Sequence, residues 1–218
     1  MFITLEGIEG CGKSTQLDML CDYFKNKSRL LVCTREPGGT RIGKEIRSIL
    51  MNTDHTELEP LAELFLIVAD RAQHVREVIA PALLAGEMVL CDRFMDSTVA
   101  YQGFGRGVDL ELLELLNMRA VDTCVPDMTI LIDCPVDVAL KRTKTRLARN
   151  RELADEQRFE REDRSFHRRV REGFLWIAKR EPERVTILNG TLSPEELYRQ
   201  VLKVVLDGVK RFTGLVKG

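Results

Sequence analysis

The feature that most constrains the fold is the segment 7–14, which reads Gly-Ile-Glu-Gly-Cys-Gly-Lys-Ser. An apolar run over 2–5 precedes this segment, and helical periodicity follows it over 13–26. A strand, a glycine-rich turn and a helix start surround one point with backbone N–H groups, and the helix dipole adds to their attraction for phosphate. In such a loop Lys13 reaches the β- and γ-phosphates, and Ser14 binds Mg²⁺. The pattern predicts a nucleoside triphosphate site, and the flanking elements disfavour a chance match.

Short β-rich runs alternate with helical periodicity along the whole chain. This alternation predicts an α/β domain spanning 1–218, with a five-stranded parallel sheet and helices on both faces. Ser193-Pro194-Glu195-Glu196 also has the pattern of a capping box with proline at the first helical position. The predicted strands are 2–5, 30–34, 87–91, 128–133 and 185–188, and the predicted helices are 13–26, 41–50, 60–85, 109–119, 136–147, 159–180 and 194–211.

The composition indicates a soluble cytoplasmic protein. The formal net charge is −1, which favours neither a protein that coats nucleic acid nor one that binds a membrane surface. No apolar run approaches the ~20 residues that a membrane-spanning helix needs. The cysteines form no C-x-x-C pair, so we expect reduced thiols with neither a disulfide framework nor a zinc site. There are six of them, at Cys11, Cys21, Cys33, Cys91, Cys124 and Cys134.

A second site for anions is predicted downstream of the glycine-rich loop. The segment 34–40 reads Thr-Arg-Glu-Pro-Gly-Gly-Thr, in which the glycines allow close backbone approach and Arg35 supplies a bidentate guanidinium. The predicted strand 87–91 runs into Asp92 and Arg93, an acid that can hold Mg²⁺ beside an arginine that can bind an acceptor phosphate. The guanine-specific N-K-x-D pattern of GTPase switches is absent. Two anion sites indicate phosphoryl transfer between two phosphate-bearing molecules.

The segment 141–164 is dense in charge and poor in large apolar residues. We interpret it as containing a mobile basic lid at about 142–160. A solvated helix surface is the alternative interpretation, because charge runs commonly lie on exposed helices.

At the level of whole motifs, the chain resembles the thymidylate kinase family. The matching segments are 2–15, Thr-Arg-Glu-Pro-Gly-Gly-Thr at 34–40, 63–74, Asp-Arg-Phe-Met-Asp-Ser-Thr-Val-Ala-Tyr-Gln-Gly at 92–103, and the region after Arg158. The resemblance implies a P-loop nucleoside-monophosphate kinase fold with a lid. It also implies phosphorylation of dTMP to dTDP with ATP and Mg²⁺, and a homodimer.

The resemblance further implies which residues bind dTMP. Arg35 and Arg93 would hold its phosphate. Phe65 would stack on thymine and Arg71 would donate to a base carbonyl, although periodicity alone favours core packing for Phe65. Tyr101 would lie against the deoxyribose as a steric gate, or would only pack. The full implied set is Glu9, Arg35, Phe65, Arg71, Arg93, Ser97, Thr98, Tyr101 and Gln102.

The catalytic arginine is expected in the lid. Some family members carry an arginine after the acidic residue of the phosphate loop, whereas bacterial-type members carry glycine there, and here Gly10 follows Glu9. A lid arginine would then neutralise the phosphoryl group during transfer. The predicted catalytic residues are Lys13, Arg93, Arg146, Arg149 and Arg151. Ser14 and Asp92 are the predicted metal ligands, and the predicted ATP-binding residues are Gly7, Ile8, Glu9, Gly10, Cys11, Gly12, Lys13, Ser14, Thr15 and Arg142.

Two other classes of function remain open at the level of sequence. A kinase-like domain could bind nucleotide without catalysis, although the intact Lys13, Ser14, Asp92 and Arg93 argue against this. A deoxynucleoside kinase would have an acceptor without phosphate, and Arg35 would then have no anion to bind.

Overall fold

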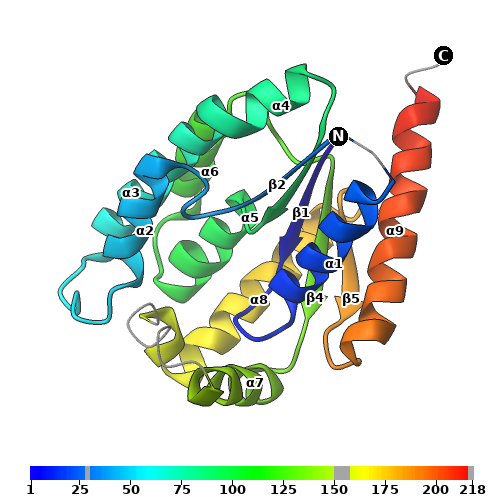
Figure 1. Ribbon diagram of the computed structural model, residues 1–218. Coiled ribbons are helices and arrows are strands. Elements are labelled where there is room, and N and C mark those ends of the chain that lie inside the picture. The colour runs from blue at the N-terminus through cyan, green and yellow to red at the C-terminus, as the bar shows by residue number, and fades with distance from the viewer. Residues whose placement is uncertain (28–29, 150–157, 216–218) are drawn as a thin grey trace.

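The computed structural model describes residues 1–27, 30–149 and 158–215 (Figure 1). Its centre is a parallel sheet of five strands in the order β2-β3-β1-β4-β5. The predicted fold class is thereby confirmed. The strands are β1 Phe2–Glu6, β2 Leu31–Arg35, β3 Met88–Asp92, β4 Met128–Asp133 and β5 Val185–Asn189.

The central strand β1 is buried along its whole length, which explains its nearly continuous apolar sequence Phe-Ile-Thr-Leu-Glu. It pairs with β3 on one side and with β4 on the other, so the chain order reverses there. Loops that leave neighbouring strands in opposite directions open a crevice at the carboxyl ends of the strands. The glycine-rich loop follows β1 directly and therefore lies in this crevice.

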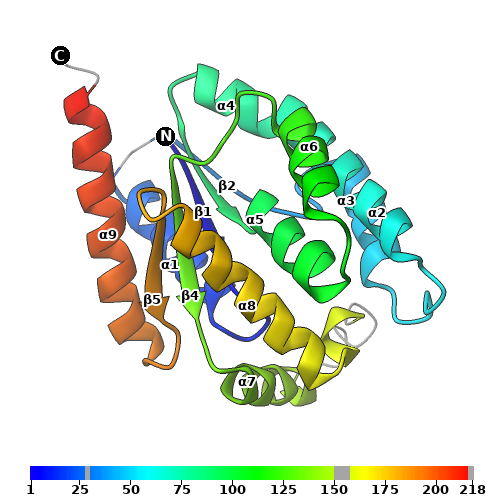
Figure 2. The same ribbon diagram turned by 180° about the vertical axis from the view of Figure 1, so that it is seen from behind.

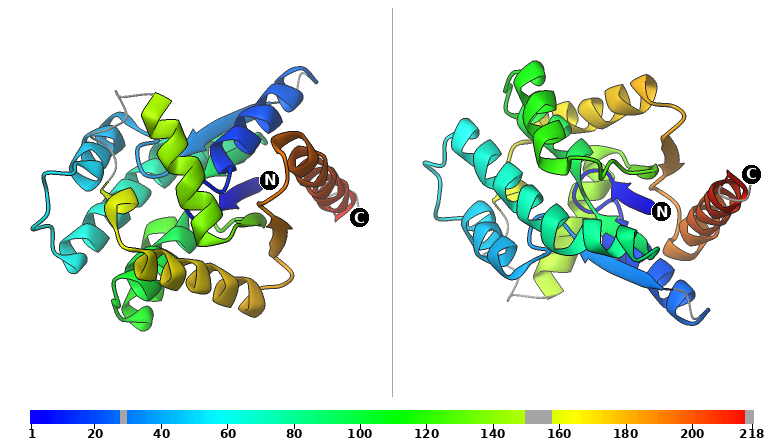
Figure 3. Two further views of the ribbon diagram at one scale, coloured as in Figure 1. Left: turned by 90° about the horizontal axis from the view of Figure 1, so that it is seen from below. Right: turned by 90° about the horizontal axis from the view of Figure 1, so that it is seen from above.

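Helices cover both faces of the sheet, as the alternation predicts. Figure 1 shows α1 and α9 on the near face, and Figure 2 shows α8 and the short α5 on the opposite face. The views along the sheet show α7 crossing the carboxyl ends of the strands (Figure 3). No helix in the described part of the chain is both long and apolar enough to cross a membrane. The bounds are α1 Lys13–Lys25, α2 Arg41–Met51, α3 Pro60–His74, α4 Ala80–Leu84, α5 Met95–Thr98, α6 Leu110–Val121, α7 Val136–Arg149, α8 Arg164–Arg180 and α9 Pro194–Leu215.

Two helical segments differ from those that periodicity predicts. The stretch expected as one helix over 60–85 is α3 and α4 joined by a wider π-helical segment, η1 Val75–Ile79. Pro81 explains the widening, because a proline ring would collide with the carbonyl one turn earlier in a regular helix. The second segment, η2 Val99–Gly105, continues α5 as another π-helix; periodicity does not indicate it, although the resemblance implies a helix after Asp92 and Arg93 that carries Tyr101. Regular periodicity is lost there, and such segments are frequent at functional sites.

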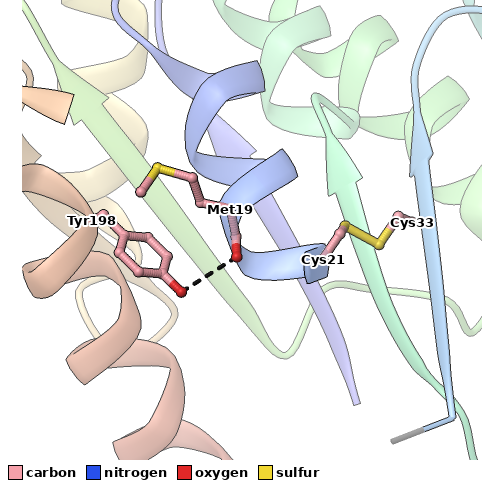
Figure 4. Close-up of a disulfide and its surroundings, with 4 residues drawn as sticks. All are labelled: Met19, Cys21, Cys33 and Tyr198. Carbon is pink, nitrogen blue, oxygen red and sulfur yellow. Dashed lines mark hydrogen bonds between the residues drawn. A yellow bond between two sulfur atoms is a disulfide. The ribbon is translucent and has the colours of Figure 1, made fainter. Parts of the chain in front are cut away.

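The structure corrects the prediction that every cysteine is a free thiol. Cys21 of α1 and Cys33 of β2 form a disulfide with their Cα atoms 6.4 Å apart (Figure 4). The pairing arises because α1 packs across β2, a contact that sequence spacing does not reveal. In the same view the Tyr198 hydroxyl of α9 donates to the Met19 carbonyl at 3.3 Å, so α1 is held on both sides. The four other cysteines are free and buried, at Cys11, Cys91, Cys124 and Cys134.

We expect reduction of this disulfide to lower the thermal stability. The bond closes a loop with a sequence separation of 12, for which chain entropy gives about 2–3 kcal/mol. For a chain of this size that corresponds to a fall in Tm of roughly 5–10 °C. Melting of wild type with and without a dithiol reductant measures it. Cys33→Ser is the matched control, since its Tm should not respond to reductant. A wild-type Tm unaffected by reductant, together with six thiols that react with an alkylating agent in the denatured, unreduced protein, would contradict the disulfide.

Candidate active site

A cavity of about 560 Å³ lies at the carboxyl ends of the strands. Segments that are distant in sequence form its walls: the glycine-rich loop, the segment after β2, η2, one face of α7, and the turn before α9. All are brought there by the parallel sheet, because every strand delivers its following loop to the same edge. The cavity therefore contains both of the predicted anion sites.

The glycine-rich loop is arranged around the ammonium group of Lys13. Lys13 is almost completely buried, and Nζ donates to the carbonyls of Gly7 and Ile8, each at 2.9 Å. Gly12 precedes α1 with φ of 111°, a conformation that favours glycine. The predicted ATP-binding residues Glu9 to Thr15 all line the cavity. Gly7 and Ile8 do not, and their carbonyls instead hold Lys13.

Gly10 shows why the loop carries no side chain at this position. Its φ is 74°, and a Cβ built on it would lie 2.2 Å from the Ala139 carbonyl and 2.5 Å from Thr143 Oγ1. Both residues belong to α7, so the helix packs directly on the backbone of the loop. An arginine could not fit at position 10 unless α7 moved. Two arginines of α7, Arg142 and Arg146, line the cavity as well.

The two predicted metal ligands lie together. Ser14 Oγ donates to Asp92 Oδ2 at 2.6 Å, and Asp92 Oδ1 is buried without a hydrogen-bond partner among the described residues. A hydroxyl beside a carboxylate is a suitable pair of hard oxygen donors for Mg²⁺, which keeps several waters and takes its other ligands from phosphate. The described residues hold no cluster of three His, Cys, Asp or Glu side chains that could form a metal site without the nucleotide. The pair therefore fits Mg²⁺ bound together with nucleotide phosphates.

Arg93 lines the cavity between the glycine-rich loop and η2. It follows β3 with φ of 69°, a sparsely populated conformation for a residue with a side chain. Nη1 donates to the Gly7 carbonyl at 2.9 Å and to Ser97 Oγ at 3.1 Å. Nη2 donates to Glu9 Oε1 at 2.9 Å and to the Tyr101 hydroxyl at 3.0 Å. The strained backbone thus places one guanidinium between the phosphate loop and η2.

Glu9 is held as a carboxylate by its surroundings. Burial would raise its pKa, but the positive charges of Arg93 and Lys13 and the contact with His167 outweigh burial, so the pKa lies well below its usual range. Tyr101 donates to Glu9 Oε1 at 2.5 Å. His167 of α8 lies completely buried with Nδ1 3.6 Å from Glu9 Oε2. No local sequence pattern marks His167 as part of the site, because it lies in the middle of an amphipathic helix.

The far end of the cavity lies between α3 and η2 and contains neutral and charged hydrogen-bonding groups. Arg71 is buried, and it donates to Glu36 at 2.7 Å, to Asn117 at 2.5 Å and to Thr98 at 2.8 Å. Gln102 lines the cavity beside them. The predicted residues Arg35, Ser97, Thr98, Tyr101 and Gln102 all line the cavity as well, with Arg35 at its exposed edge.

The structure contradicts the predicted stacking role of Phe65. Its side chain is 52 % exposed and does not line the cavity. Ile67, which is 9 % exposed, lines the cavity instead. Two residues along a helix correspond to a rotation of about 200°, so Phe65 and Ile67 face opposite sides of α3. The spacing from Arg71 could have found Ile67, because residues four apart share a helix face.

The lid region is only partly within the described residues. Arg142 donates to the carbonyl of Gly190 at 2.6 Å and so holds the turn before α9 against α7. Arg146 lines the cavity and donates to Glu160 Oε1 at 2.8 Å. Arg149 ends α7, but its side chain and the whole of Arg151 lie outside the described residues, as do 150–157 of the predicted lid.

Comparison with known proteins supports the resemblance across almost the whole chain. The thymidylate kinase family model matches residues 5–201. The chain belongs to the thymidylate kinase family. It is 52 % identical over 189 residues to the thymidylate kinase of Desulfosudis oleivorans, covering 87 % of this chain and 88 % of the relative. It is 48 % identical over 207 residues to that of Trichlorobacter lovleyi, covering 95 % and 97 %.

A solved structure agrees with these relatives. The crystal structure of thymidylate kinase from Ehrlichia chaffeensis has a TM-score of 0.75 and 35 % sequence identity, covering 94 % of this chain and 98 % of that one. Membership of the family makes the chain an ATP-dependent nucleoside-monophosphate kinase, which is a phosphotransferase. The predicted family, fold and class of enzyme are therefore confirmed.

Proposed function

We propose that phosphorylation of dTMP by this chain takes place in the cavity described above, with ATP bound as its Mg²⁺ complex. The observation that carries this proposal is that Arg93 joins the glycine-rich loop to η2, so that the donor and acceptor sites share one guanidinium. ATP would lie over the loop, with its adenosine end towards Arg142 and the turn before α9. dTMP would lie between Arg35, Arg93 and the far end between α3 and η2.

The residues of the chain would act mainly by positioning and by neutralising charge, as in other phosphoryl-transfer enzymes. Lys13 would move from the Gly7 and Ile8 carbonyls to the phosphates. Ser14 and Asp92 would hold Mg²⁺, which when bound neutralises charge on the phosphate oxygens. Arg93 would orient the acceptor phosphate, and Arg146 would approach the transferred group from α7.

Side-by-side turnover of dTMP, dUMP, dCMP and thymidine with ATP tests this proposal. We expect dTMP to be the best acceptor and thymidine the poorest, because thymidine offers no phosphate to Arg35 and Arg93. If thymidine had a kcat/KM equal to that of dTMP, the acceptor site would be wrongly assigned and the deoxynucleoside kinase alternative would be favoured.

We expect Tyr101→Ala to reduce the preference for deoxyribose over ribose. A rigid ring beside the 2′ carbon leaves an added hydroxyl neither space nor a partner, whereas a purely apolar pocket discriminates by only ~100-fold. Tyr101 is 5 % exposed, and its hydroxyl is fixed by Glu9 and Arg93. The measurement is the kcat/KM ratio of dTMP to its ribose analogue, which should fall at least ~10-fold.

Tyr101→Phe is the matched control for this prediction, since it keeps the ring and removes only the hydroxyl. The ring packs edge-on against Phe159, Phe166 and Phe174, so melting curves must show that the alanine variant still folds. Parallel losses for the two substrates, with an unchanged ratio, would assign Tyr101 a packing role.

We also propose that the chain forms a homodimer through the outer surface of α2, α3 and α6. These helices pack side by side with α3 in contact with both others (Figures 1 and 2). Large apolar side chains that are well exposed on them are Ile42, Ile49, Leu61, Phe65, Leu115 and Met118. An exposed apolar surface spread over neighbouring helices is typical of an interface, and a second copy would cover it and Phe65.

Phe65→Asp should convert the dimer into a monomer, because a buried unpaired charge strongly disfavours association. Sedimentation equilibrium measures the mass. Leu84→Asp is the control, since Leu84 is the most exposed large apolar residue in the described part of the chain and lies on α4, outside this surface. A monomeric wild type at micromolar concentration would contradict the proposal.

A cytoplasmic location is proposed as well, because ATP and dTMP are used there, and activity in fractionated cells checks it.

A further inference from the structure

Glu63, in the first turn of α3, is a completely buried carboxylate that no role in the reaction yet explains. Oε1 accepts from Gln102 Nε2 at 2.7 Å and from Arg106 Nε at 3.3 Å. Oε2 accepts from Arg106 Nη2 at 3.3 Å and from Arg158. Two guanidinium groups therefore balance the charge. Three side chains fix the carboxylate in place: Gln102 and Arg106 come from η2 and its C-terminal end, and Arg158 comes from a separate segment.

The contact with Gln102 fixes the orientation of its side-chain amide. A carboxylate offers only acceptors, so the nitrogen of the amide must face Glu63. Gln102 is 1 % exposed and lines the cavity, which leaves its amide oxygen as the atom turned towards a ligand. Without such a partner, the oxygen and nitrogen of an amide exchange places by rotation, and the same residue then offers donors.

The position of Gln102 gives this orientation a chemical consequence. Thr98, one turn earlier, holds Arg71, and both residues line the same end of the cavity. An acceptor at Gln102 matches a pyrimidine that carries a hydrogen on N3, as thymine and uracil do. Cytosine presents an unprotonated N3 acceptor, and two facing acceptors leave both groups without a hydrogen bond.

We propose that Glu63 is a positioning residue that orients the amide of Gln102 and thereby selects pyrimidine monophosphates with N3–H over those without it. The inference rests on the proposed placement of the dTMP base between α3 and η2. Glu63 acts through Gln102 and does not itself contact the substrate. Because Arg158 donates both to Glu63 and to the Leu50 carbonyl at 2.7 Å, the same carboxylate also connects the base site to the end of α2.

Glu63→Gln tests the proposal. The Oε2 position accepts from two guanidinium groups, those of Arg106 and Arg158, whereas the Oε1 position accepts from Gln102 and from Arg106 alone. The new amide should therefore keep its oxygen at the Oε2 position and turn its nitrogen towards Gln102. The amide of Gln102 should then rotate and present its donors to the cavity. We expect the kcat/KM ratio of dTMP to dCMP to fall at least ~10-fold, which is the scale of one buried hydrogen bond. Arg71 is untouched and should keep part of the selectivity.

Two further variants separate positioning from a structural effect. Glu63→Gln combined with Gln102→Glu restores an acceptor that faces the cavity and should recover most of the ratio. Glu162→Gln is the matched control, because Glu162 pairs with Arg106 at 2.7 Å without an observed hydrogen bond to Gln102, and its ratio should equal that of wild type. A merely structural role predicts equal losses for dTMP and dCMP in the single variant and no recovery in the double variant.

A folded Glu63→Gln variant with an unchanged ratio would overturn the proposal, provided that wild type phosphorylates dTMP. A wild type without activity on dTMP would instead contradict the proposed function. If the variant does not fold, a crystal structure of wild type with dTMP decides. Thymine N3 should lie within hydrogen-bond distance of the Gln102 amide atom that does not contact Glu63. A base whose N3 lies out of reach of this atom, or a Gln102 that leaves Glu63 when dTMP binds, would overturn the proposal.

Discussion

Lys13→Ala is expected to lower kcat by at least ~100-fold, the loss that follows removal of a major electrostatic stabiliser from an active site. The buried ammonium group lies at the turn between β1 and α1, where the loop's backbone N–H groups and the helix dipole attract the same phosphates. It already faces negative partial charges on the Gly7 and Ile8 carbonyls. If phosphate oxygens replaced these two carbonyls as partners, the full positive charge of Lys13 would lie where negative charge develops on the phosphates during transfer.

The control for this prediction must separate lost charge from a loosened loop. Lys25→Ala removes an exposed lysine from the other end of the same helix and should leave kcat within a few-fold of wild type. Circular dichroism and melting show whether Lys13→Ala retains the fold. We expect that it does, because the turn of the loop depends on the backbone conformations of Gly10 and Gly12 and not on the Lys13 side chain. Near-normal turnover by a correctly folded Lys13→Ala would mean that the triphosphate does not bind over this loop.

The sequence predicts well those parts of the fold that are encoded locally. The five strands were predicted to within one residue at each end, because each is a short apolar run bounded by turns or helices. The capping box at the start of α9 is present as predicted, with Glu196 N donating to Ser193 Oγ at 3.3 Å and Ser193 N to Glu196 at 3.1 Å. Both features depend only on residues within a few positions of one another.

Features that depend on packing between distant segments were missed. The Cys21–Cys33 disulfide requires α1 to lie across β2, and Glu63 acquires its partners only when η2 and Arg158, near the end of the predicted lid, meet α3. The resemblance places Phe65 on the wrong face of its helix, because α3 is apolar on two sides and apolar periodicity alone does not show which side faces the cavity. The four-residue spacing between Ile67 and Arg71 is the sequence signal that points to the correct face.

The second prediction with a large effect concerns Arg146, which lines the cavity and is the one of the three predicted catalytic lid arginines whose side chain lies within the described residues. Arg146→Ala should lower kcat by roughly 100- to 1,000-fold and change the KM values for ATP and dTMP much less, because its charge would stabilise the transferring phosphoryl group and not the bound ground state. The side chain is 52 % exposed and pairs with Glu160 at 2.8 Å, so its removal should leave the stability almost unchanged. Steady-state kinetics with each substrate varied in turn measures the separation.

Arg164→Ala is the matched control for Arg146. Arg164 is likewise an exposed arginine in an ion pair with a carboxylate, in its case Asp137 at 3.3 Å. It should leave kcat within a few-fold of wild type. A small effect of Arg146→Ala alone would move the catalytic charge to Arg149 or Arg151, so the triple alanine variant at all three positions gives the decisive result. If that variant turned over at a near-normal rate, the charge that neutralises the phosphoryl group would have to come from Arg93 and Lys13, and α7 would serve only to close the cavity over Gly10.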